Sequence, residues 1–237
     1  MRPVFRTTGR FVEKPRAKGM LSRSGTSFNP LSLGAPAAWY RRGIGFTDAG
    51  AGACSAWADQ SGNGRNLVQG TAANRPTIQS DGSLIFDGAD DSLQALFTLN
   101  QPYSVYMVVR QLAWTANRYL LDGGTGNATI IQDDLGVSPD LEIFAGTRLR
   151  PLSGPAIGTT AVVTAVFNGA SSSLSLNNGT PITGAAGANN PGGVTVGGAL
   201  SLGSLCSNIR VWEVMIRNGA DDAATQTAIF NYLRARI

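Results

Sequence analysis

Short apolar runs separated by turn residues repeat along most of this chain. From residue 37 onward the runs are divided by Gly, Asn, Asp and Pro at intervals of about 8–12 residues. This spacing predicts an all-β domain of the sandwich or barrel type. The predicted strands are residues 37–40, 54–58, 66–69, 83–86, 92–97, 103–112, 118–121, 128–132, 141–145, 161–167, 173–176, 194–196 and 208–216.

One of these runs is apolar on both of its faces. Successive side chains of a strand point to opposite sides, which divides the run between Tyr103 and Arg110 into two sets. The two sets are Tyr103, Val105, Met107 and Val109 on one face, and Ser104, Tyr106, Val108 and Arg110 on the other. We therefore expect a central strand that is covered on both sides. Farther along, the dipeptide Asn178-Gly179 predicts a hairpin turn.

A single helix is predicted at residues 221–236. Asn218 or Asp221 can cap its N-terminus, and the arginines in its last turn suit the negative end of a helix dipole. Apolar residues recur at a spacing of four, which predicts a stripe that packs on the strands. The stripe consists of Ile229, Leu233 and Ile237.

Residues 1–35 differ from the rest of the chain in charge. They carry seven basic residues against one acid, Glu13, for a net charge of +6, whereas residues 36–237 carry twelve arginines, no lysine and 14 acids, a net charge of −2. Pro and Gly interrupt the segment, and it cannot bury enough apolar surface to offset its ordering entropy. We expect an extended basic arm that other subunits hold, followed by one domain at residues 36–237. The basic residues are Arg2, Arg6, Arg10, Lys14, Arg16, Lys18 and Arg23.

The partner expected for this arm is a protein. Basic side chains can neutralise phosphates, but the arm has only Phe5, Phe11 and Phe28 as aromatic residues, too few to interleave with bases. Nucleic acid is therefore not the expected partner. Its spaced charges suit a strap across acidic grooves, and residues 7–11 can add a strand to the sheet edge of another subunit.

Several chemistries are excluded or left open by residue counts. The chain has no histidine, which removes Ser/His/Asp and Cys/His nucleophile arrangements and His-ligated zinc. Cys54 and Cys206 are either two small buried residues or one long-range disulfide. No segment approaches the roughly 18 apolar residues of a membrane span, and no secretory signal follows the basic start. We expect a protein with no membrane association.

Four segments of the chain resemble the laminin-G-like/concanavalin A-like jelly-roll family. They are residues 56–67 (AWADQSGNGRNL), 74–78 (NRPTI), 85–93 (IFDGADDSL) and 209–216 (IRVWEVMI), the last followed by a helix. The resemblance covers about residues 37–237 and implies a concanavalin A-like jelly-roll β-sandwich. Such domains are frequent in bacterial and tailed-phage structural proteins, and the fold also hosts lectins and glycosidases.

The glycosidases of this fold carry a Glu-x-Asp-x-x-Glu strand, because glycoside hydrolysis uses two carboxylates that face the sugar. This chain has only Glu13, Glu142 and Glu213, and none stands in that pattern. We therefore expect that the chain is not an enzyme and has no catalytic residues.

Two other kinds of site are weighed from residue type. Asp90 and Asp91, with Asp87, could supply oxygen ligands to Ca²⁺, but Asp-Gly-x-Asp-Asp is also a good polar turn, and no metal or cofactor is expected. Trp57 and Trp212 lie in apolar runs and are expected in the core. Trp114 follows a strand and is the aromatic residue expected to be exposed and to contact a ligand.

The function expected from the arm and the resemblance is structural. We expect a non-enzymatic virion protein, a phage capsid decoration or cement protein whose basic arm binds the major capsid protein or other virion subunits. Such a protein would be a homo-oligomer, for which a trimer is the first expectation, found in the virion after assembly in the host cytoplasm. The alternative is a carbohydrate-binding, lectin-like module of a phage tail, fibre or spike. The sequence leaves the capsid and tail positions both open.

Overall fold

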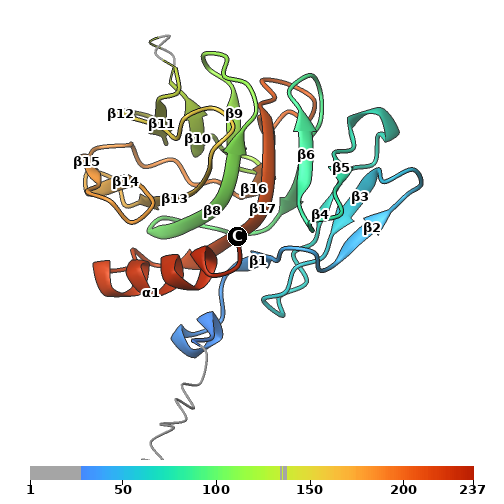
Figure 1. Cartoon of the computed structure of the whole chain (residues 1–237). Coiled ribbons are helices and arrows are strands. Elements are labelled where there is room, and N and C mark those ends of the chain that lie inside the picture. Colours follow the sequence, from blue (N-terminus) through green and yellow to red (C-terminus); the bar gives the residue numbers. More distant parts are fainter. Residues whose placement is uncertain (1–27, 134, 136–137) are drawn as a thin grey trace, which may run out of the picture.

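The predicted strands pair into two antiparallel sheets that face each other, with one helix outside the first sheet (Figure 1). This arrangement is that of a jelly-roll β-sandwich. The computed structural model describes residues 28–133, 135 and 138–237.

Sheet A has the strand order β15-β14-β13-β8-β17-β6-β5, and β1 also pairs with β17. The bounds of its strands are β1 Ala38–Tyr40, β5 Thr77–Ile78, β6 Leu84–Asp87, β8 Tyr103–Gln111, β13 Thr160–Phe167, β14 Ser172–Leu176, β15 Ile182–Gly184 and β17 Asn208–Asn218.

Sheet B has the strand order β12-β11-β10-β9-β16-β7-β4-β3-β2. The bounds of its strands are β2 Phe46–Asp48, β3 Cys54–Trp57, β4 Leu67–Val68, β7 Leu93–Leu96, β9 Tyr119–Asp122, β10 Thr129–Gln132, β11 Leu141–Phe144, β12 Arg148–Leu152 and β16 Gly193–Val196. The described part of the chain also contains two short 3₁₀ helices, η1 Pro30–Leu33 and η2 Ala72–Asn74.

Every predicted strand is confirmed, and the four strands that the apolar pattern missed share one property. These strands, β2, β5, β12 and β15, stand at the ends of the two strand orders. An edge strand is half exposed and tolerates polar residues and proline; β12 reads Arg-Leu-Arg-Pro-Leu. Its sequence therefore lacks the apolar signal of an interior strand.

The strand β8 is central, as predicted, and both of its faces are buried. Tyr103, Val105, Met107 and Val109 lie in the main core between the sheets. On the other face, Tyr106 and Val108 pack beneath the helix. The main core also contains Trp57, as expected, and Trp212 lies in the smaller cluster under the helix.

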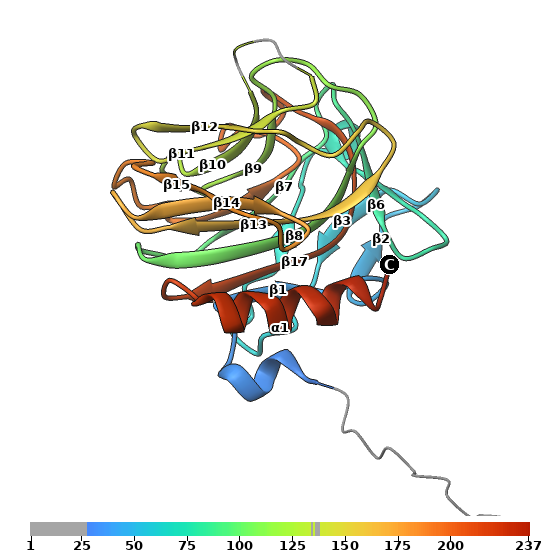
Figure 2. The ribbon, with the colours of Figure 1, turned by 60° about the vertical axis from the view of Figure 1, so that its left-hand side comes forward.

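The helix α1, Ala223–Arg234, lies across the outer face of sheet A (Figure 2). Its N-cap is Asp222, whose side chain accepts the Thr225 N–H at 2.8 Å. This is neither of the two predicted cap residues. Asp221 instead accepts hydrogen bonds from Tyr106 and Arg217, both at 2.8 Å. Ile229 and Leu233 are buried as predicted, whereas Ile237 follows the helix and is 47% exposed.

The seven basic residues of the predicted arm lie outside the described residues. The part of the arm that is described, residues 28–35, packs on the chain's own body instead of extending away from it. The Phe28 ring meets the Tyr232 ring of α1 edge to face at 6.4 Å, and Arg217 donates to the Leu33 carbonyl at 2.9 Å. These contacts tie the described residues 28–35 to the body, and the division between residues 35 and 36 stays a prediction.

The structure also describes the two cysteines, the predicted hairpin turn and the length of the helices. Cys54 and Cys206 are free, buried thiols, so the disulfide alternative is wrong. The β14–β15 hairpin turns at Asn177 and Asn178, which adopt φ values of 52° and 57°. Within the described ranges, no helix has the length and apolar character needed to cross a membrane.

Candidate functional site

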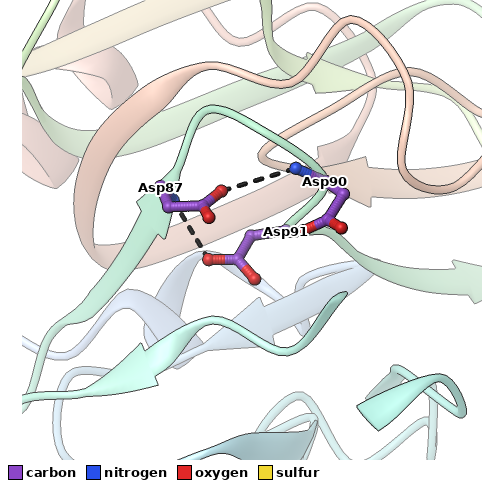
Figure 3. Close-up of side chains that lie close together, drawn as sticks. All are labelled: Asp87, Asp90 and Asp91. Atoms are coloured by element: carbon purple, nitrogen blue, oxygen red, sulfur yellow. Dashed lines mark hydrogen bonds between the residues drawn. The ribbon is translucent and has the colours of Figure 1, made fainter. Parts of the chain in front are cut away.

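A cluster of three aspartates occupies the corner where the chain leaves sheet A for sheet B (Figure 3). Asp87 ends β6, and Gly88 follows with a φ of 81°. A Cβ atom at Gly88 would lie 2.8 Å from the Asn208 backbone nitrogen, so this corner requires glycine. One carboxylate oxygen from each of Asp87, Asp90 and Asp91 lies within 4.8 Å of the others.

The aspartates of this cluster make the hydrogen bonds of a polar turn. Oδ2 of Asp91 accepts the Asp87 N–H at 3.0 Å, and Oδ1 of Asp87 accepts the Ala89 N–H at 2.8 Å. Burial, followed by the charges of Asp87 and Asp90, raises the pKa of Asp91 to about 6. Asp90 and Asp91, the candidate calcium ligands, thus lie together with Asp87, and Asp91 is only 6% exposed.

Trp114, the predicted ligand contact, is half-buried in the loop after β8. Its Nε1 donates to the Asp140 carbonyl at 3.2 Å. This hydrogen bond ties the indole to the loop before β11. Trp114 therefore holds two loops together, and it lies outside the lining of the grooves considered below.

The two glutamates of the body are buried and paired. Glu142 of β11 contacts Arg148 and lies 3.4 Å from an Arg150 nitrogen. Glu213 of β17 accepts the Trp39 Nε1–H at 2.8 Å. Neither lines the two grooves described below, and the partners of both are arginine or tryptophan side chains.

Asp122 is a further buried carboxyl that the sequence did not single out. Its oxygens accept backbone N–H groups from Gly123 at 2.7 Å and from Leu200 at 2.8 Å. Burial raises its pKa to about 6 despite these hydrogen bonds. Asp122 thereby joins the loop after β9 to the loop after β16 on the outer side of sheet B.

A groove of about 410 Å³ lies between the β14–β15 hairpin and the first turns of α1. Its walls carry mostly hydroxyl and amide side chains, and we call it the hydroxyl groove. Its polar lining residues are Ser171, Ser173, Ser175, Asn178, Thr183, Asp221, Gln226 and Thr227.

Strand pairing and helix docking together build this groove. Ser173 and Thr183 are direct register partners on β14 and β15, so their side chains share one face of sheet A. From the helix side, the Thr227 hydroxyl reaches the Asn178 side chain at 3.2–3.3 Å. The serine run at 171–175 was the available sequence signal, but its meaning depends on the helix that packs opposite it.

Solved structures that share this fold include a sialidase and an arabinofuranosidase in complex with sugars. Trypanosoma rangeli sialidase in complex with 2,3-difluorosialic acid aligns with a TM-score of 0.64 and 14% identity over 85% of this chain and 34% of that chain. The same sialidase in complex with sialic acid aligns at 0.59 and 14% identity, over 84% of this chain and 33% of that one. An arabinofuranosidase complexed with arabinofuranosyl-alpha-1,2-xylobiose aligns at 0.53 and 14% identity, over 78% of this chain and 51% of that one.

These likenesses establish the fold, and the chain spans a third to a half of the length of those proteins. No protein-family model and no curated protein matches the sequence. The comparisons overturn the expectation that this chain is not an enzyme. Hydrolases share its fold over most of its length, so the missing histidine and the missing glutamate motif do not exclude catalysis.

Proposed function

We propose that this chain is a carbohydrate-binding β-sandwich module. The observation that carries the proposal is the fold, which most of the chain shares with structures solved with bound sugars. Fold alone is an analogy, and the hydroxyl groove supplies independent support. Its lining offers both donors and acceptors at a size that suits one or two sugar rings.

The charge state of the hydroxyl groove favours a neutral sugar. Asp221 is the acidic residue of its lining, and Arg217 and Tyr106 already bind its carboxylate. The remaining polar groups are serine, threonine, asparagine and glutamine side chains, which pair with sugar hydroxyls without a net charge. A pocket of this kind binds weakly unless several hydrogen bonds form together.

A glycan array with three variants tests this function. Ser173→Ala and Thr183→Val remove one groove hydroxyl each with little change of volume. Thr71→Val removes a hydroxyl that makes no capping hydrogen bond at the exposed start of η2 and serves as the matched control. We expect the groove variants to lose most binding and the control to keep it. Equal binding by all three proteins, or no glycan bound by the parent, would reject the hydroxyl groove as the site.

A second function is supported by the charge split of the sequence rather than by the comparisons. The +6 charge of residues 1–35 beside a body of net charge −2 suits an anchor to acidic surfaces of other subunits. We propose, as this second candidate, a virion protein that its arm attaches to the major capsid protein or another virion subunit. Homo-oligomerisation as a trimer belongs to the same proposal.

Particle binding distinguishes the second candidate from the first. A protein with the seven basic arm residues changed to Gln is expected to detach from particles at lower salt than the parent, because salt screens exposed charge pairs. Particles that lack the protein should then release their genome at lower temperature, since binding to the assembled shell stabilises that state. Normal thermal resistance combined with slower adsorption to cells would instead support the carbohydrate-binding function.

A further inference from the structure

Two arginines lie directly opposite each other on the outer face of sheet A. Arg110 of β8 and Arg210 of β17 are register partners in the antiparallel pair. Both guanidinium groups stand over the Trp212 ring, at 5.3 Å and 5.2 Å from its centroid. Like charges in directly opposite positions destabilise a sheet, so this placement calls for negative charge nearby.

One carboxylate side chain, that of Asp81, lies beside these two arginines, and it already has partners. It forms an ion pair with Arg210 at 2.7 Å and accepts the Trp212 Nε1–H at 3.1 Å. Although partial burial acts to raise its pKa, hydrogen bonds from Ser83, Arg210 and Trp212 lower the pKa of Asp81 to about 2. Asp81 is therefore ionised at neutral pH and balances the charge of Arg210.

Arg110 and a third arginine, Arg42, donate hydrogen bonds to neutral partners. Arg110 donates through Nε and a terminal nitrogen to the Thr160 hydroxyl, at 3.0 Å and 2.7 Å. Arg42 donates to the backbone carbonyl of Asp81 at 2.8 Å and to that of Arg236. In the described part of the chain, no ion pair joins either arginine to a carboxylate.

These groups line one groove, which we call the arginine groove. It has a volume of about 370 Å³ and is lined by Arg42, Asp81, Arg110, Thr160, Trp212 and Ile237. The volume exceeds that of a simple ion and suits a group of the size of one sugar ring. Its lining thus combines two guanidinium groups, a hydroxyl, an indole, an aliphatic residue and the Asp81 carboxylate that Arg210 already pairs.

We propose that the arginine groove binds an acidic sugar, with Arg42 and Arg110 holding its oxyanion group. Guanidinium groups bind planar and tetrahedral oxyanions through paired N–H donors. Thr160 and the exposed part of Trp212 then contact the ring of the sugar. The inference rests on the proposed carbohydrate-binding function and adds to it a charged ligand at a second groove.

Titration calorimetry with three small probes tests the proposal. D-glucuronate carries a carboxylate, glucose 6-sulfate carries a sulfate, and glucose is the neutral analogue of both. We expect the two charged probes to bind the full chain at least tenfold more tightly than glucose. Comparing the two charged probes identifies which oxyanion the groove prefers.

Three variants locate the binding. Arg110→Gln is expected to weaken both charged probes about tenfold or more. Arg118→Gln removes the same charge just before β9, on the sheet B side, and should leave binding unchanged. Thr160→Ala keeps every arginine and should weaken the binding of both charged probes. Equal affinity for glucose and the charged probes, or an equal loss in Arg118→Gln and Arg110→Gln, would overturn the proposal.

The same titrations separate this inference from the function on which it rests. Inorganic sulfate is a fourth probe and needs no sugar contact. If sulfate binds and Arg110→Gln abolishes that binding, while no sugar binds anywhere, then the acidic-sugar proposal and the carbohydrate function both fail, although an anion site remains. If neutral glycans bind, and the charged probes bind the parent and Arg110→Gln with equal affinity, only the inference fails.

Discussion

The indole Nε1 of Trp39 donates a 2.8 Å hydrogen bond to Oε1 of Glu213 in the buried layer between sheet A and α1. The bond joins the first strand of the body to its last strand, which are also register neighbours through Trp39 and Met215. Arg236, beyond the end of α1, lies 3.5 Å from the other carboxylate oxygen. One glutamate thereby connects the start of the body, its closing strand and the end of the chain.

Glu213→Ala is expected to lower the free energy of unfolding by about 2–3 kcal/mol, because it leaves the buried Trp39 N–H without an acceptor. Glu213→Gln keeps an acceptor oxygen and should cost about 1 kcal/mol. Urea unfolding of the two variants measures the difference. Equal losses in both variants would contradict the importance of the Trp39 hydrogen bond.

Two tryptophans differ in what their removal should cost. Trp57 is fully buried against Tyr40 and Phe46, and Trp57→Ala should destabilise the chain by about 3–5 kcal/mol. Trp114 is half-buried, and Trp114→Ala should cost about 1 kcal/mol. Thermal unfolding measures both, and glycan binding by Trp114→Ala should equal that of the parent because Trp114 lies outside the hydroxyl groove. Lost binding in this variant would return Trp114 to the ligand site.

Two buried carboxyls should make the free energy of unfolding decrease as the pH rises from about 4 to about 6. Burial raises the pKa of Asp91 and of Asp122 to about 6 from the ordinary 3.8. The folded state therefore binds more protons than the unfolded state in this window, and the free energy of unfolding decreases as pH rises through it. Each carboxyl contributes a change on the order of 3 kcal/mol.

The variant Asp91→Asn isolates the share of one carboxyl, because its side-chain oxygen can still accept the Asp87 N–H. We expect the stability of this variant to fall less steeply across the window than that of the parent. Asp48→Asn, an exposed change at the end of β2, is the control and should follow the parent curve. Chemical unfolding at a series of pH values gives the three curves, and parallel curves for Asp91→Asn and the parent would contradict the assignment.

The aspartate corner should behave as a turn rather than as a calcium site. Backbone N–H groups already use an oxygen of Asp87 and one of Asp91, which leaves few free ligands for a cation that requires six to eight oxygens. Millimolar CaCl₂ should therefore shift the melting temperature no more than MgCl₂ at equal concentration. A rise that is specific to calcium and that Asp90→Asn abolishes would show a cation site.

The arrangement of the sugar-binding candidates could be anticipated only in part. A serine run at 171–175 and isolated arginines are visible in the sequence, but each has an ordinary interpretation as exposed surface. The hydroxyl groove exists because α1 packs beside the β14–β15 hairpin. The arginine groove exists because β8 pairs with β17, which lies about a hundred residues later in the sequence and brings Arg210 opposite Arg110.

The sequence by itself determined the interior strands, the two-sided burial of β8 and the terminal helix, because apolar periodicity acts over a few positions. It also determined the charge contrast between residues 1–35 and the body. Only the tertiary structure decided the four edge strands, the cap at Asp222, the two free thiols and the facing arginines. Each of these features depends on a partner distant in sequence or on what a neighbouring side chain already binds. Asp221, for example, has the residue type and position of a helix cap, but in the fold its carboxylate accepts hydrogen bonds from Arg217 and Tyr106.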